Sequence, residues 1–190
     1  MSAENLTNIQ QPSEAEAVAR TLPKVEARFD PERMSLLLGL EGEHLDPGLS
    51  EKLTSHGFEP KEDLHMTAIG FKNGRTLVKA LKAMPDAQRQ VAMDTISSAA
   101  QNTDWNITPN GQFFGLEKQY DGEETPRRSL VEMVDCPQLG EFYGLIGSVV
   151  PGLDLEVPLA HITLGTEGNP SGVRIDNVAE LQQFGQSIEL

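Results

Sequence analysis

Two short apolar segments, one in each half of the 190-residue chain, carry a histidine, one apolar residue and a threonine in succession. They are His65-Met66-Thr67 and His161-Ile162-Thr163, and a glycine follows closely after each. Apolar runs of this length are typical of buried β-strands. Because side chains alternate between the two faces of a strand, each segment would present one imidazole and one hydroxyl on a common face. The intervening apolar residues would then point into a core.

The rest of the chain predicts more strands than helices, in an order that favours hairpin connections. Helical spacing extends from residue 73 to about 102 with a break at Pro85, and a further helix is expected at 137–149. Pro109, Asn110 and Gly111 indicate a turn between two short strands. The other expected strands are 34–40, 63–71, 129–134, 155–165 and one or two after 173. This pattern is typical of an α+β fold with antiparallel pairing.

Composition and charge restrict the class of protein. The net charge is −14 and the pI is about 4.6, which weighs against a dedicated binder of long duplex nucleic acid. A small phosphate-bearing substrate in a locally arranged pocket stays compatible with this charge. No apolar run approaches the roughly 20 residues of a membrane span, and the start of the chain lacks the features of a signal peptide. With a single cysteine, Cys136, these features predict a cytoplasmic protein.

Residues 1–30 differ from the remainder, because Gln, Asn, Ser and Glu dominate them. We expect them to form a flexible acidic N-terminal head. Residues 31–190 are expected to form a single domain.

The paired His and Thr residues suit phosphodiester chemistry. Imidazole has an ordinary pKa of about 6.5, so one histidine can act as a base while the other, protonated, acts as an acid. The threonine hydroxyls can donate hydrogen bonds to phosphate oxygens on which charge develops. This set is sufficient without a metal, and the sequence contains no cysteine and histidine cluster with metal-ligand spacing. We therefore expect neither a metal nor a cofactor. Buried structural histidines are the alternative interpretation.

The two H-x-T segments resemble the motifs of the 2H phosphoesterase superfamily. Residues 160–166 (AHITLGT) are especially similar to the second motif of its myelin-type and RNA-repair branches. The resemblance implies a bilobal, pseudo-twofold fold in which two antiparallel sheets line a central cleft and helices lie outside. It also implies that His65 and His161 are the catalytic acid and base, and that Thr67 and Thr163 bind the phosphate.

Members of this superfamily commonly use an aromatic residue and an added cation to hold the substrate. The candidates in this chain are Tyr120, Arg127 and Arg128 in and after a polar loop, with Phe114 or Phe113 for stacking on a base. Core packing is the alternative interpretation for each phenylalanine, and a solvated loop is the alternative for the arginines.

The expected function is hydrolysis of a 2′,3′-cyclic phosphate, a cyclic oligonucleotide, or a short oligonucleotide or RNA end with 2′,5′ or 3′,5′ linkages. The partner would be that small nucleotide substrate and no membrane, and the protein would be a monomer. The alternative function is a non-catalytic module of the same fold that binds nucleotides or RNA ends.

Overall fold

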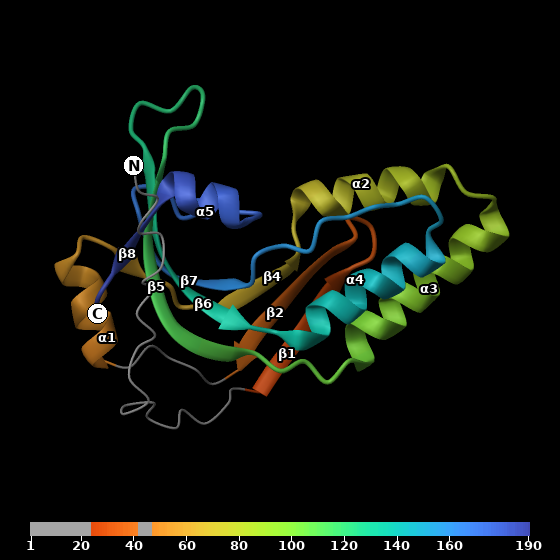
Figure 1. Cartoon of the computed structure of the whole chain (residues 1–190), viewed down its shortest axis with the longest axis horizontal. Helices are drawn as coiled ribbons and strands as arrows, with labels where there is room; N and C mark the ends of the chain where they lie inside the picture. Colours follow the sequence, from red (N-terminus) through yellow and green to blue (C-terminus); the bar gives the residue numbers. More distant parts are fainter. Residues whose placement is uncertain (1–23, 42–46) are drawn as a thin grey trace, which may run out of the picture.

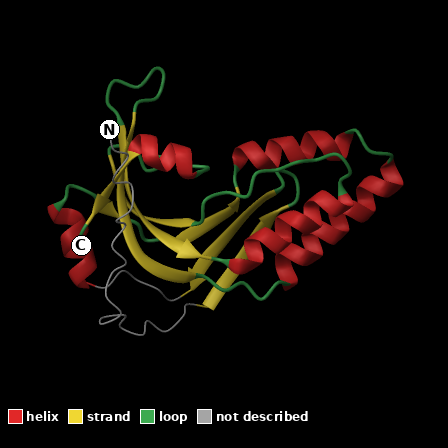
Figure 2. Ribbon diagram, viewed as in Figure 1, coloured by secondary structure: helices red, strands yellow, loops and turns green. Residues whose placement is uncertain are grey.

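The computed structural model describes residues 24–41 and 47–190. In these ranges the chain forms eight strands and five helices, and the strands pair antiparallel in one curved sheet (Figures 1 and 2). This architecture confirms the predicted α+β class. No helix of the described ranges is long and apolar enough to cross a bilayer.

Strands and helices alternate irregularly along the chain. The strands are β1 (Lys24–Asp30), β2 (Ser35–Glu41), β3 (Glu59–Pro60), β4 (His65–Ile69), β5 (Thr108–Lys118), β6 (Arg127–Asp135), β7 (His161–Glu167) and β8 (Gly185–Ile188). The helices are α1 (Pro47–Ser55), α2 (Phe71–Lys82), α3 (Asp86–Asn102), α4 (Pro137–Val149) and α5 (Val178–Phe184).

The two motif strands are neighbours at the middle of the sheet, whose order is β1-β2-β4-β7-β6-β5-β8. Met66 of β4 pairs with Ile162 of β7, and β3 also pairs with β7. The prediction of two separate sheets was therefore wrong. The pairing of β3 and β4 with β7 joins the strands from both halves of the chain into one sheet.

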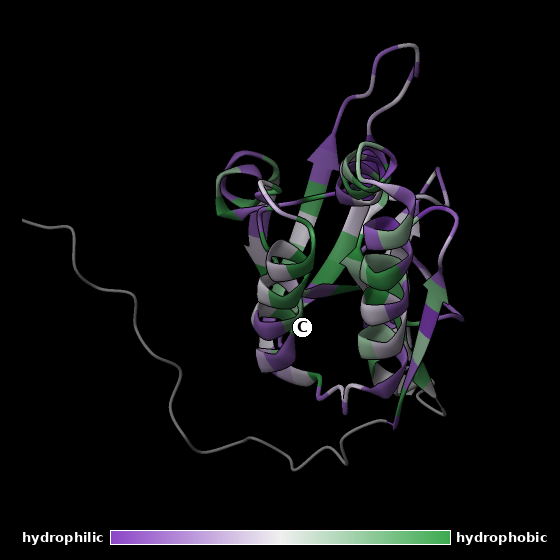
Figure 3. Ribbon diagram, turned by 90° about the vertical axis from the view of Figure 1, so that its right-hand side faces the viewer, coloured by the Kyte–Doolittle hydropathy of each residue, from purple (hydrophilic) through white to green (hydrophobic). Residues whose placement is uncertain are grey.

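One face of the sheet forms the main core. Met66 and Ala68 of β4, and Ile162 and Leu164 of β7, are at most 2 % exposed, which confirms the predicted alternation. They pack with apolar residues of helices α1 to α4. Figure 3 shows the hydrophobic stretches of the strands between the helices, whereas the polar loop beyond β5 extends into solvent.

The opposite face of the sheet carries a second, smaller apolar cluster. It comprises Leu116, Val131, Met133, Val173 and Ile175. Two of its members come from the segment 168–177, which crosses this face between β7 and α5 (Figure 1). The histidines and threonines of the two motifs lie on this second face.

The structure corrects two predicted boundaries. Residues 24–30, assigned to the N-terminal head, form β1, because Val25, Ala27 and Phe29 alternate with polar residues and pack against the core. The remainder of the head, residues 1–23, lies outside the described ranges. At the C-terminus, residues 178–184 form α5, which the sequence analysis did not anticipate, and Asn177 caps it by accepting a hydrogen bond from the Glu180 N–H.

The predicted turn at residues 109–111 was also wrong. Residues 108–118 form the single strand β5, which pairs with β6 along its length apart from an irregularity between Pro109 and Phe113. The turn chemistry is present locally, because Gly111 has a φ of +73° and the Asn110 side chain accepts a hydrogen bond from Gln112 N. The residues before Asn110 and those after Gln112 all pair with the same strand, β6, so this feature is a bulge within β5 and not a hairpin turn.

Candidate active site

A cavity of about 290 Å³ lies over the middle of the sheet, on the face opposite the main core. Both motifs contribute to its floor through His65, Thr67, His161 and Thr163. The structure therefore brings together all four residues that the sequence analysis assigned to catalysis and phosphate binding.

The register of β4 against β7 fixes how these four side chains are arranged. Met66 pairs with Ile162, so extending the antiparallel register by one residue on each side places His65 opposite Thr163 and Thr67 opposite His161. Directly opposed side chains have Cβ atoms about 5 Å apart, while diagonal neighbours are separated by roughly 7–8 Å between Cα atoms. The two imidazoles lie on one diagonal of the square and the two hydroxyls on the other, a spacing that fits a phosphate between them.

Both imidazoles are held by the same backbone contact. Nδ1 of His65 lies 3.3 Å from the carbonyl oxygen of Asp63, and Nδ1 of His161 lies 2.8 Å from that of Leu159. A carbonyl only accepts, so each Nδ1 donates its proton and the Nε2 atom on the opposite side of the ring is left for another partner. This tautomer is the one that acid–base chemistry at Nε2 requires.

The threonine hydroxyls are available for a ligand. Neither Thr67 nor Thr163 forms a side-chain hydrogen bond with another residue of the described ranges. Both side chains are partly exposed toward the cavity. Two open donors on a rigid sheet are suited to the non-bridging oxygens of a phosphate.

The electrostatic surroundings of the two histidines differ. Burial lowers the pKa of His161, partly offset by its hydrogen bond to Leu159 and by the charge of Asp176, so the neutral ring is favoured there. His65 lies beside Asp63, whose Oδ2 is 3.4 Å from its Nδ1. Hydrogen bonds from Arg28 hold the pKa of Asp63 below its usual range, so this carboxylate is ionised at neutral pH.

One wall of the cavity is the segment 168–177, which hydrogen bonds attach to the sheet and to neighbouring loops. Val173 N donates to Ser129 Oγ at 2.7 Å, and Leu159 N donates to Asp176 O at 2.9 Å. The side chain of Lys61 donates to the carbonyl of Pro170. Gly172 lets the segment lie close to the sheet, because its φ is +62° and a Cβ there would be 2.5 Å from Ser129 Oγ.

Several cavity residues were missed by the sequence analysis. They are Lys61, Asp63, Phe71, Asn73, Arg174 and Asp176. Asp63 and Phe71 had a readable signal, since both lie in the expected strand 63–71, where alternation places them on the same face as His65. In the structure Asp63 precedes β4 and Phe71 begins α2. Arg174 and Asp176 belong to a segment that was assigned to a strand, so nothing in the sequence pointed to them.

Phe71 stands out among these residues because it is 69 % exposed at the start of α2. Arg75 lies over its ring at 5.4 Å. An aromatic ring left open at the edge of a polar cavity is a surface on which a planar group can stack.

The predicted substrate contacts Tyr120, Arg127, Arg128 and Phe114 do not line the cavity. The two arginines are paired with carboxylates, Arg127 with Glu123 and Arg128 with Glu167 and Glu117. Phe114 is half-buried against the second apolar cluster, and Phe113 packs against the main core.

Tyr120 has an indirect relation to the cavity. Its hydroxyl accepts a hydrogen bond from Arg174 N at 3.3 Å, and Arg127 lies over its ring at 4.4 Å. Tyr120 therefore supports the cavity wall from outside.

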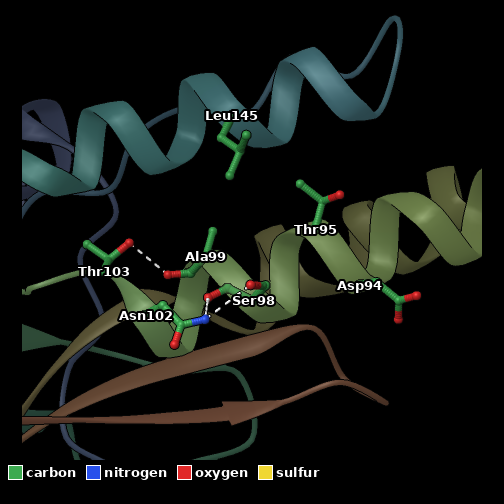
Figure 4. A pocket seen from close by; sticks show the side chains of 7 residues that line it. All are labelled: Asp94, Thr95, Ser98, Ala99, Asn102, Thr103 and Leu145. Atoms are coloured by element: carbon green, nitrogen blue, oxygen red, sulfur yellow. Dashed lines mark hydrogen bonds between the residues drawn. The ribbon is translucent and has the colours of Figure 1, made fainter.

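A second hollow lies between α3 and α4 (Figure 4). Its polar side chains are used within α3 or at its end: Thr95 and Thr103 donate to the carbonyls of Val91 and Ala99, and Asn102 donates to Ser98. None of its described lining residues is a histidine.

The other histidines and the acidic side chains do not form a second site in the described ranges. His56 is exposed after α1, while His44 lies outside the described ranges. Among residues 24–41 and 47–190, no three His, Cys, Asp or Glu side chains are grouped so as to hold a metal ion. The histidines, threonines and charged side chains that could act on a substrate are grouped in the cavity over β4 and β7.

Comparisons with known protein families, with curated proteins and with solved structures give no match to this chain. The resemblance to the 2H phosphoesterases therefore stays a prediction from the two sequence motifs.

Proposed function

We propose that this protein is a metal-independent phosphodiesterase that hydrolyses a small nucleotide substrate by acid–base catalysis with His65 and His161. One observation carries the proposal: two imidazoles with open Nε2 atoms and two unpaired threonine hydroxyls alternate around one cavity. Structural histidines in strands would not require two open hydroxyls beside them. The neutral histidine takes a proton from the nucleophile, and the protonated one gives a proton to the leaving oxygen.

The other cavity residues support a nucleotide as the substrate. Lys61 and Arg174 bring positive charge to a chain of net charge −14, and Thr67 and Thr163 complete a set of phosphate donors. Phe71 offers a stacking surface for a base, a contact that contributes about 1–3 kcal/mol in single-strand binders. A cavity of about 290 Å³ matches a mononucleotide or the cleaved linkage of a short oligonucleotide better than a duplex.

We extend the proposal to a pseudo-twofold arrangement of the fold. Strands β1 and β2 flank β4 on one side of the centre, and β6 and β5 flank β7 on the other. Each half would contribute one imidazole and one hydroxyl to the phosphate between them.

Turnover in a chelator tests this function. The protein would be incubated in excess EDTA with 2′,3′-cyclic nucleotides, 2′,5′-oligoadenylate and cyclic dinucleotides. We expect hydrolysis of at least one class at a rate that EDTA does not change. Loss of activity in EDTA would contradict the metal-free mechanism, and binding without turnover would favour a nucleotide-binding module.

A further inference from the structure

The two motif histidines differ in the side chain two residues before them. Asp63 precedes His65 and points its carboxylate at the imidazole, with Oδ2 3.4 Å from Nδ1. Leu159 precedes His161 and packs its apolar side chain against the second cluster. One imidazole therefore has an anion beside it, whereas its counterpart has a hydrocarbon side chain in the same position.

Arg28 of β1 holds the Asp63 carboxylate in place. Its guanidinium donates two hydrogen bonds to Asp63, at 2.8 and 3.2 Å. It reaches Asp63 across Gly39 of β2, where a Cβ would lie 2.3 Å from Arg28 Nη2. The path exists because β2 has a glycine at the position that pairs with His65. Three strands therefore combine to fix one carboxylate beside one histidine.

The remaining charged groups near the two imidazoles are already paired with other partners. The other titratable groups that line the same cavity are Lys61, Arg174 and Asp176, and Glu26 lies 3.9 Å from Arg28 Nε. Arg174 Nε is already paired with Asp176 at 2.8 Å, and Lys61 with a backbone carbonyl. Asp63 is thus the carboxylate that contacts an imidazole directly, whereas Asp176 acts on His161 only through its charge.

We propose that Asp63, positioned by Arg28, sets the direction of the reaction: His65 gives a proton to the leaving oxygen, and His161 takes one from the nucleophile. This assignment rests on the proposed function. Asp63 and Arg28 act through His65, so they are positioning residues.

Each histidine handles one proton in this reaction. A water oxygen bonds to phosphorus while its proton moves to Nε2 of neutral His161. The bond from phosphorus to the leaving oxygen breaks, and that oxygen receives the Nε2 proton of the His65 imidazolium. The products are a phosphate monoester and an alcohol, and exchange of protons with solvent restores both rings. The diagonal placement of the imidazoles puts water and leaving group on opposite sides of phosphorus, as in-line displacement requires.

Imidazole ¹⁵N NMR tests the assignment without any substrate. At neutral pH we expect a larger protonated fraction for His65 than for His161. Asp63→Asn should lower the protonated fraction of His65, and Arg28→Gln should lower it less. Asp104→Asn makes the same change at an exposed position outside the cavity and should alter neither ring. A larger protonated fraction for His161, or no response to Asp63→Asn, would overturn the assignment.

Leaving-group dependence provides the kinetic test. The first substrate is a methyl ester of thymidine 5′-monophosphate, whose leaving group needs a proton. With it we expect His65→Gln and His161→Gln to lower kcat by at least about 10²-fold, and Asp63→Asn to lower kcat as well. A p-nitrophenyl ester leaves without protonation, so His65→Gln and Asp63→Asn should then come within about tenfold of wild type, while His161→Gln keeps its full loss.

The outcomes separate the two proposals. Rescue of His161→Gln instead of His65→Gln by the aryl ester reverses the assignment and leaves the phosphodiesterase function in place. If no ester and no nucleotide of the EDTA panel is hydrolysed, the proposed function fails. The ¹⁵N result then still decides whether Asp63 polarises the histidine pair.

Discussion

Strands β4 and β7 present the same motif in different surroundings. On β4, the His65 side chain is 31 % exposed and lies beside a carboxylate that an arginine holds. On β7, burial lowers the pKa of His161, and the residue two positions earlier is apolar. One residue type can therefore serve two chemical roles, because the neighbours, not the motif, decide which protonation state is favoured.

The two strands are also supported differently. The β4 side is supported from the core, where the Tyr143 hydroxyl donates to Ala68 O and accepts from Asn73 Nδ2, both at 2.9 Å. The β7 side is bordered by the segment 168–177, whose Asp176 carbonyl accepts a hydrogen bond from Leu159 N just before β7. Arg174 N of the same segment donates to the hydroxyl of Tyr120, in the loop after β5. Variants on each side therefore test whether the halves are equivalent.

The largest expected effect comes from removing either imidazole. His65→Ala and His161→Ala should each lower kcat by at least about 10²-fold, because each removes one proton transfer. The double variant should be little worse than the single ones, since the two groups act in one step. Steady-state kinetics would measure these losses, with the exposed His56→Ala as the matched control. Near-full activity in either single variant would rule out the paired mechanism.

The threonine hydroxyls should have the next largest effect. Thr67→Val and Thr163→Val should each lower kcat by about tenfold or more, because each removes a donor to the phosphate while keeping the side-chain shape. Thr→Ser at the same positions keeps the hydroxyl and should restore most of the rate. If Val and Ser variants behaved alike, the hydroxyls would not be phosphate ligands.

Substrate stacking should have a smaller effect, and on KM. Phe71→Ala should raise KM about fivefold with little change in kcat, as expected for the loss of about 1 kcal/mol of base stacking. The control is Val91→Ala, which truncates another exposed hydrophobic residue, on α3. An unchanged KM across nucleotide substrates would remove Phe71 from the site.

The supports of the two halves should differ in stability. Tyr143→Phe should lower the free energy of unfolding by about 1–2 kcal/mol, because its buried hydroxyl makes two hydrogen bonds. Burial raises the pKa of Tyr143 to about 12, so this hydroxyl stays protonated in ordinary buffers. Tyr120→Phe should cost less, since its hydroxyl accepts one longer bond at 3.3 Å. Equal losses in urea denaturation would contradict the difference between the halves.

The smallest expected effect is a pH dependence of folding. The pKa of His161 is lower in the folded state than the ordinary value of about 6.5, so its contribution to stability is complete above that value. Stability should fall as pH drops below about 6.5 toward the lowered pKa, because the unfolded chain binds the proton first. In His161→Gln this slope should be reduced in thermal unfolding measured across pH. An unchanged slope would mean that His161 is not buried in its neutral form.

Alternation along the strands predicted much of this site. Because every second side chain of a strand points to the same face, the sequence predicted both imidazoles and both hydroxyls on one face. The structure confirms that these four side chains line one cavity. The same reasoning assigned Met66 and Ile162 to the core, where each is at most 2 % exposed. These features depend only on residues near one another in the chain.

The features that the sequence analysis missed depend on contacts between distant segments. Arg28 meets Asp63 only because β1, β2 and β4 pair in one register with a glycine between them. Arg174 reaches the cavity because its segment is bonded across the sheet to Ser129 and Tyr120. Turn chemistry at Gly111 became a bulge for the same reason, since strand pairing outweighed the local preference.

The pH dependence of kcat/KM tests the central claim most directly, because it detects the acid and the base separately. Wild type should give a bell-shaped profile, in which a neutral His161 is required on the acidic side and a protonated His65 on the alkaline side. His161→Gln should lose the acidic limb and His65→Gln the alkaline limb. Profiles in which both limbs persist in both variants would contradict catalysis by this histidine pair.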